Sequence, residues 1–134
     1  MTIDVVDLDH VAIRVSDIES ALAFYHDLLG LPIRDRDRFE AGEVPFVAVK
    51  AGGRHLHLVP SEDPIDVGGE HLCLLVRSAE MESRDELDAL LAEIEAAGYR
   101  VEPDEPKKRY GAYGRDWAAY VRDPDGRRVE LKIH

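Results

Sequence analysis

An internal repeat limits the folds open to this sequence more than any other feature. Two segments, 9–15 and 70–76, each begin with an acidic residue and a histidine and continue as a mostly apolar run. They read Asp9-His10-Val11-Ala12-Ile13-Arg14-Val15 and Glu70-His71-Leu72-Cys73-Leu74-Leu75-Val76. Each run is short and mostly apolar, which predicts a largely buried strand. The repeat therefore predicts two modules with the same architecture.

Each of these strands is followed by a segment with the pattern of an amphipathic helix. A capping box begins each segment, apolar residues then recur at helical spacing, and a glycine marks the end. In the first half these features are Ser16 with Glu19, the stretch 18–29, and Gly30. In the second half they are Ser83 with Glu86, the stretch 87–97, and Gly98.

Further short strands are predicted after each helix, and together they define the fold class. They are expected at 46–49, 55–59, 117–121 and 129–133, with weaker patterns at 33–39 and 99–102. Asp123-Pro124-Asp125-Gly126 is typical of a hairpin turn, and 60–69 is the expected connector. Neither half would bury much apolar surface alone. We therefore expect one α+β domain, 1–134, with two paired βαβββ modules at about 5–60 and about 68–134.

Composition excludes several classes of function. The 134 residues are 45% apolar and 34% charged, as in a globular protein, and the formal charge of −11 provides no basic surface for nucleic acid. The cluster Lys107, Lys108 and Arg109 could attract an acidic small molecule or form a solvated loop. No apolar run is long enough to cross a membrane, and the N-terminus lacks the basic residues of a signal peptide. We expect a cytoplasmic protein.

Four possible metal ligands fall on equivalent positions of the two repeats. His10 and His71 match in the opening strands, and His57 and Glu130 match in the closing segments 54–59 and 127–132. Taken singly, each is more often an ordinary strand residue. Since they match as two pairs, we expect one site for Zn, Ni, Mn or Fe. The single cysteine, Cys73, excludes a zinc site built from several cysteines and an internal disulfide.

The sequence resembles the vicinal oxygen chelate superfamily, also called the glyoxalase/bleomycin resistance/dioxygenase superfamily, over nearly its whole length. The segments that carry the resemblance are 7–33, 52–59, 68–76 and 123–133. The resemblance implies paired βαβββ modules around a metal-lined cleft, and often a homodimer. It assigns ligand positions to His10, His71 and Glu130, and His57 occupies a position that varies between branches. It also implies a small-molecule substrate chelated through adjacent oxygens, with Glu130 as the proton shuttle.

A lyase or isomerase of the glyoxalase type, similar to a lactoylglutathione lyase or an epimerase, is the leading expectation. Arg14 shares a strand face with His10, and its place resembles that of the glutathione-contacting arginine of glyoxalase I. A salt bridge at the rim is the alternative role for Arg14. His57 counts against this branch, because glyoxalase I usually has a carboxylate there. The segment 107–117 could contact substrate or form a surface hairpin that packs its own aromatic residues. The expected substrate contacts are Tyr110, Tyr113, Arg115 and Trp117.

Two other branches remain as alternatives. His10, His71 and Glu130 match the two-histidine, one-carboxylate set of non-haem iron dioxygenases. Those enzymes are mostly longer, and His57 as a fourth ligand would close a position that oxygen and substrate need. Fosfomycin-modifying members usually continue past the glutamate with a histidine–glycine stretch, whereas this sequence ends at His134. Drug-binding members of the bleomycin-resistance type would normally lack the ligand set, so resistance is the weakest alternative.

Overall fold

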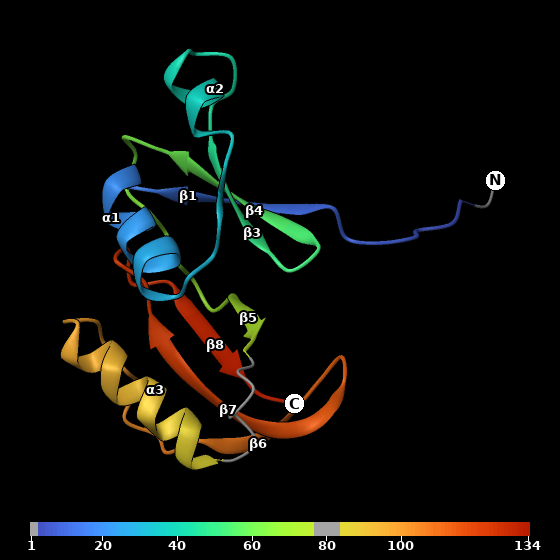
Figure 1. Ribbon diagram of the computed structural model, residues 1–134, viewed down its shortest axis with the longest axis vertical. Coiled ribbons are helices and arrows are strands. Elements are labelled where there is room, and N and C mark those ends of the chain that lie inside the picture. Colours follow the sequence, from blue (N-terminus) through green and yellow to red (C-terminus); the bar gives the residue numbers. More distant parts are fainter. Residues whose placement is uncertain (1–2, 77–83) are drawn as a thin grey trace. The chain divides into compact units, whose positions relative to one another are not determined.

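The chain folds into two compact units with the same architecture. The computed structural model describes residues 3–76 and 84–134. It divides into Met1–Ile65 and Asp66–His134, each with one four-stranded sheet and at least one helix (Figure 1). The predicted α+β class with two similar modules is confirmed. That both modules form a single domain stays a prediction.

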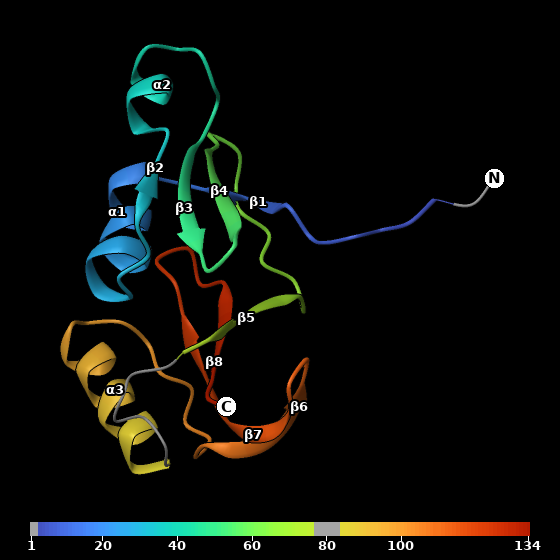
Figure 2. The same cartoon turned by 45° about the vertical axis from the view of Figure 1, so that its right-hand side comes forward.

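The first unit has the strand order β1-β4-β3-β2 (Figure 2). β1 runs parallel to β4, while β3 is antiparallel to both β4 and β2. Its core includes Val15, Phe24, Tyr25, Val47, Val49 and Leu58. The elements are β1 His10–Val15, α1 Ile18–Leu22, the π-helix η1 Ala23–Leu28, β2 Ile33–Arg34, α2 Arg36–Glu40, β3 Val47–Ala51 and β4 Arg54–Pro60.

The second unit repeats this topology with the order β5-β8-β7-β6. β5 runs parallel to β8, and β7 is antiparallel to β8 and β6. α3 packs against β7, and the core includes Leu87, Ile94, Val121, Val129 and Leu131. The elements are β5 His71–Leu75, α3 Arg84–Ala96, β6 Lys107–Gly111, β7 Gly114–Arg122 and β8 Arg128–Lys132.

The first helix begins and continues differently from the prediction. Its N-cap is Asp17, whose carboxylate accepts from the Ser20 N–H at 2.9 Å, so the predicted cap at Ser16 is wrong by one residue. From Ala23 the turns widen into η1, which the apolar periodicity does not reveal. Gly30 ends the helix with φ +79°, as predicted. The second predicted cap, Ser83, lies outside the described residues.

Two weakly patterned segments also differ from the prediction, and a third segment adopts one of its two expected forms. In 33–39, β2 covers only Ile33–Arg34, and α2 follows after Asp35 takes a left-handed φ of 62°. In 99–102, Val101 makes one isolated bridge to Val121. The segment 107–117, for which a surface hairpin was one of two alternatives, forms the β6–β7 hairpin.

The turn between β7 and β8 agrees with the prediction and is tightly hydrogen-bonded. The Gly126 N–H donates to the Asp123 carbonyl at 2.9 Å, and the buried Asp123 carboxylate accepts from the Arg127 N–H at 2.9 Å and from Arg127 Nη1 at 2.8 Å. This turn fixes the register that sets Tyr120 opposite Glu130. Among the described residues, no helix combines the length and apolar character needed to cross a membrane.

Candidate functional site

His10 and His57 stack against each other on one face of the first sheet. The parallel pairing of β1 with β4 sets His10 opposite His55 and Ala12 opposite His57, so all four side chains share a face. The rings of His10 and His57 lie 4.1 Å apart with planes 15° from parallel. Phe46 stacks on His57 at 3.8 Å. His57 therefore lies between an aromatic ring and the second imidazole.

Both imidazoles of this pair are prepared for binding a cation. His10 Nδ1 lies 2.6 Å from Asp9 Oδ1, and the hydrogen bond with His10 is the main cause that lowers the pKa of Asp9. Because a carboxylate only accepts, Nδ1 carries the proton in this contact, and Nε2 is the ring nitrogen left to bind a metal. Burial, followed by the charges of His10 and His55, lowers the pKa of His57. Burial and these two charges favour the neutral form of His57, which is the form that binds metals.

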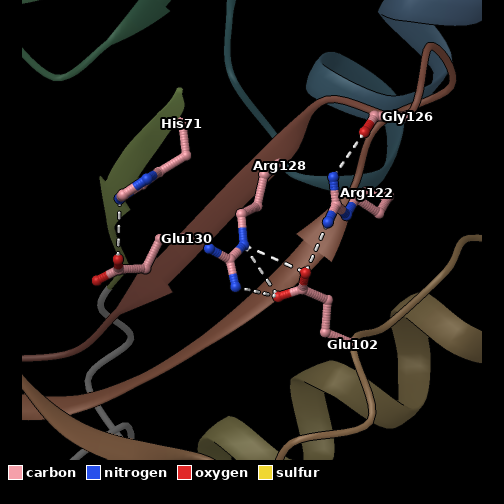
Figure 3. Close-up of polar contacts among 6 residues, drawn as sticks. All are labelled: His71, Glu102, Arg122, Gly126, Arg128 and Glu130. Carbon is pink, nitrogen blue, oxygen red and sulfur yellow. Dashed lines mark hydrogen bonds and ion pairs between the residues drawn. The ribbon is translucent and has the colours of Figure 1, made fainter. Parts of the chain in front are cut away.

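His71 and Glu130 form the corresponding pair in the second unit. His71 Nε2 lies 3.2 Å from Glu130 Oε1 (Figure 3). The Glu130 side chain is only 7% exposed, and that of His71 is 36% exposed. Among the described residues, no lysine or arginine lies within ion-pair distance of Glu130. A buried carboxylate without a cationic side chain is costly, so this position favours a bound cation.

Two further groups hold the Glu130 carboxylate. The Cys73 thiol donates to Glu130 Oε2 at 3.5 Å, and Tyr120 hydrogen-bonds to the same carboxylate. The Tyr120 ring meets His71 edge-on at 5.5 Å. Burial, followed by the hydrogen bond and charge of Glu130, raises the pKa of Tyr120. Tyr120 is therefore a neutral hydroxyl at neutral pH and can donate to the carboxylate.

The four predicted ligands thus lie as one pair in each unit. Within the two described ranges, no group of three or more histidine, cysteine, aspartate or glutamate side chains is placed to hold a metal ion. The second pair is nevertheless close to the spacing that a metal requires: nitrogen and oxygen ligands at about 2.0–2.2 Å from a tetrahedral ion lie about 3.3–3.6 Å from each other. The observed separation of 3.2 Å is just below that spacing.

The predicted substrate-contacting residues lie on different surfaces. Arg14 is exposed on the same sheet face as His10, as expected. The Trp117 ring centre lies 5.5 Å from the Arg84 guanidinium and 5.4 Å from Lys108 Nζ, and strand alternation puts Trp117 on the face opposite to Tyr120. Tyr110, Tyr113 and Arg115 are exposed, and the Arg115 guanidinium lies 5.9 Å from the Tyr110 ring. Their contacts with substrate stay a prediction.

Three side chains share the sheet face of Glu130, and sequence reasoning missed one of them, Lys132. Tyr120 is opposite Glu130, Lys132 follows it by two residues in β8, and Arg109 extends from β6 towards Tyr120. The alternation in β8 could have shown that Lys132 faces the same way as Glu130. Apolar alternation does not indicate that Arg109 lies in a strand, because β6 has none.

Comparisons with known proteins identify the family. The model of the glyoxalase/bleomycin resistance protein/dioxygenase superfamily matches residues 7–131. The mitochondrial methylmalonyl-CoA epimerase of Mus musculus is 30% identical over 137 residues, covering 93% of this chain and 71% of the epimerase. The virulence protein STM3117 of Salmonella typhimurium is 25% identical over 125 residues, covering 92% of this chain and 81% of that protein.

A solved structure extends the likeness beyond sequence. The oxidase ChaP-H2 superposes with a TM-score of 0.64 at 26% identity, covering 96% of this chain and 94% of that one. The repeated βαβββ topology and the matched range agree with each other. The chain therefore belongs to the glyoxalase/bleomycin resistance protein/dioxygenase superfamily.

Proposed function

We propose that this protein is a divalent-metal-dependent lyase or isomerase that chelates a small-molecule substrate through adjacent oxygens. The observation that carries the proposal is the buried Glu130 carboxylate, which lies 3.2 Å from His71 Nε2 and has no described lysine or arginine within ion-pair distance. The epimerase relative, at 30% identity, supports the isomerase type. His10 and His57 complete the proposed ligand set, and Zn, Ni, Mn and Fe all suit three imidazoles and one carboxylate.

The chain's own residues would divide the chemistry as follows. A bound divalent metal would polarise a substrate carbonyl and stabilise the negative charge that develops on its oxygen. Glu130 would accept the proton from the carbon next to that carbonyl and later return it. In an epimerisation the proton would return to the opposite face of the same carbon. Tyr120 and Cys73 would hold the carboxylate in one orientation through their hydrogen bonds. Asp9 would orient His10.

Metal content tests the ligand assignment. Tag-free protein would be measured by elemental analysis as purified and after anaerobic loading with Zn, Ni, Mn or Fe. We expect about one ion per chain, and a clear loss in Glu130→Gln and His71→Ala. His26→Ala is the matched control, because His26 is a helical histidine whose Nδ1 is hydrogen-bonded to the Leu31 carbonyl at 2.8 Å. Equal metal content in all four proteins would contradict the assignment.

Solvent exchange tests the reaction type without requiring the right product. Methylmalonyl-CoA and a glutathione hemithioacetal would be incubated in deuterated water with the metal-loaded protein. Deuterium at the carbon next to the carbonyl, lost in Glu130→Gln, is the expected result. Absence of exchange in every metal form would count against a lyase or isomerase.

We also propose a homodimer, which light scattering after gel filtration would check.

A ring-cleaving dioxygenase is the second candidate. It is favoured by the two-histidine, one-carboxylate subset and by the 26% identity with an oxidase. Tyr120, in hydrogen-bond contact with Glu130, would then serve as an acid–base group beside a catechol. Oxygen uptake by the iron-loaded protein on addition of a catechol would favour this candidate, and uptake without catechol would not.

A further inference from the structure

The sheet face that carries Glu130 also carries two cations that have no carboxylate partner among the described residues. Alternation along β8 directs Arg128, Glu130 and Lys132 to one face. The register adds Tyr120 from β7 and, through Asp116, Arg109 from β6. Arg128 is accounted for, since it pairs with Glu102 at 2.9 Å (Figure 3). Lys132 and Arg109 are not.

Lys132 is buried, with an exposed fraction of 3%. Its only hydrogen-bond acceptor in the described residues is the Ile133 carbonyl, at a long 3.4 Å, and no described carboxylate lies within ion-pair distance. The side chain runs across Gly111, where a Cβ would lie 3.1 Å from Lys132 Cε and 3.2 Å from Cδ. An ammonium buried in this way lowers stability unless something anionic reaches it.

Arg109 is a second cation in the same condition. Its Nε is buried and lacks a hydrogen-bond partner among the described residues. The guanidinium lies 4.7 Å from the centre of the Tyr120 ring. The carboxylate nearest in register, Asp116, accepts instead from the Trp117 N–H at 2.8 Å. Arg109 therefore has donors that no acidic side chain in the described chain uses.

Both cations adjoin the groups that hold Glu130. Arg109 acts electrostatically on Tyr120, and Lys132 acts on Cys73. Both also meet at β6, since Arg109 and Gly111 lie two residues apart on one strand face and Lys132 packs over Gly111. The whole chain carries a net charge of −11, so its overall field repels anions. Only local cations could hold an anion here.

We propose that this face binds an anionic group of a small-molecule substrate, a carboxylate or a phosphate, through Arg109 and Lys132. The inference rests on the proposed function and adds the substrate class: an acid whose charged group lies beside the carbon on which Glu130 acts. Arginine suits this role because its guanidinium can donate two parallel hydrogen bonds to a carboxylate or phosphate. Lys132 supplies a point charge in a site from which water is largely excluded.

The test is anion binding by the metal-free full chain. Isotope-labelled protein in EDTA, at constant ionic strength, would be titrated with inorganic phosphate and separately with succinate, followed by two-dimensional NMR. We expect saturable shifts, and a Kd weakened by about tenfold in Arg109→Gln and in Lys132→Met. Lys108→Gln is the matched control: it removes the same charge from the same strand, on the opposite face against Trp117.

Each outcome bears on the proposal. The anion that binds more tightly identifies the substrate class, and equal binding of phosphate and succinate identifies a site that accepts anions of either class. No saturable binding, or equal weakening by Lys108→Gln, would overturn the proposal. If Lys132→Met does not fold, Gly111→Ala serves instead, because its Cβ displaces the Lys132 chain while both charges remain. EDTA removes metal from the experiment, so the outcome is separate from the metal measurement that tests the proposed function.

Discussion

Glu102 holds two arginines next to the candidate site, and its replacement gives a sharp test of the structure. Its carboxylate accepts from Arg128 Nε at 3.1 Å, from Arg128 Nη2 at 2.9 Å and from Arg122 Nη2 at 2.8 Å (Figure 3). The Arg128 guanidinium then lies 3.7 Å from the centre of the Tyr120 ring. Glu102 thus ties the segment after α3 to β7 and β8 and supports the side chain that contacts Glu130.

Glu102→Gln keeps the shape but removes the charge and presents an amide donor to one of the guanidinium groups. Hydrogen bonds to charged partners contribute about 1.5–3 kcal/mol each. The arginine side chains are 25% and 35% exposed, so water recovers part of the loss. We expect a decrease of about 2 kcal/mol in the free energy of unfolding. Glu105→Gln is the control, because its pair with Arg84 is at the surface and should contribute little.

The effect should depend on pH. Burial alone would raise the pKa of Glu102, but the hydrogen bonds and charges of Arg128 and Arg122 outweigh it and lower the pKa from 4.5. A carboxylate with a lowered folded-state pKa stabilises the protein at pH values above its unfolded-state pKa. This stabilisation is lost as the pH falls through the folded-state pKa. The difference between wild type and Glu102→Gln should therefore be full at neutral pH and shrink below 4.5.

Urea unfolding of the three proteins, from about pH 7 to about pH 3, measures both quantities. The reasoning is refuted if Glu102→Gln unfolds at the wild-type urea concentration at neutral pH. It is also refuted if the difference stays constant at acid pH, since the charge would then contribute nothing. A loss in Glu105→Gln as large as that in Glu102→Gln would show that the two-arginine contact is no stronger than a surface pair.

Three further results are expected. Lys132→Met should raise the melting temperature and stabilise the protein by about 1–2 kcal/mol, because it removes a buried charge that has no ion-pair partner in the described residues; a lower melting temperature would show that the charge is satisfied. Burial, followed by the charge of Glu130, raises the pKa of the Cys73 thiol to about 12, so alkylation by iodoacetamide should be slow at neutral pH and faster in Glu130→Gln, as mass spectrometry would show. Asp17→Ala should lower the melting temperature by removing the cap to Ser20, and an unchanged value would contradict that role.

The repeat was sufficient to predict the architecture because strand alternation and helix periodicity are local properties. His10 and His57 share one face of the first sheet, and His71 and Glu130 share one face of the second, as a period of two residues requires. Alternation does not reveal β6, because Lys107–Gly111 has no apolar alternation, so the hairpin was only one of two alternatives for 107–117. Its pairing with β7 depends on contacts such as Lys108 with Trp117, which exist only once the hairpin has formed.

The burial of the charged face of β8 was beyond sequence reasoning for a different reason. The run Arg128–Lys132 alternates charged and apolar residues, which is the pattern of a strand with one solvated face. In the structure Glu130 is 5% exposed and Lys132 is 3% exposed. Alternation identifies the face on which a side chain lies, but only the tertiary fold determines whether that face is covered. Because covering an acid and a base without a mutual ion pair lowers stability, this face is the part of the fold best explained by a bound cation and a bound anion.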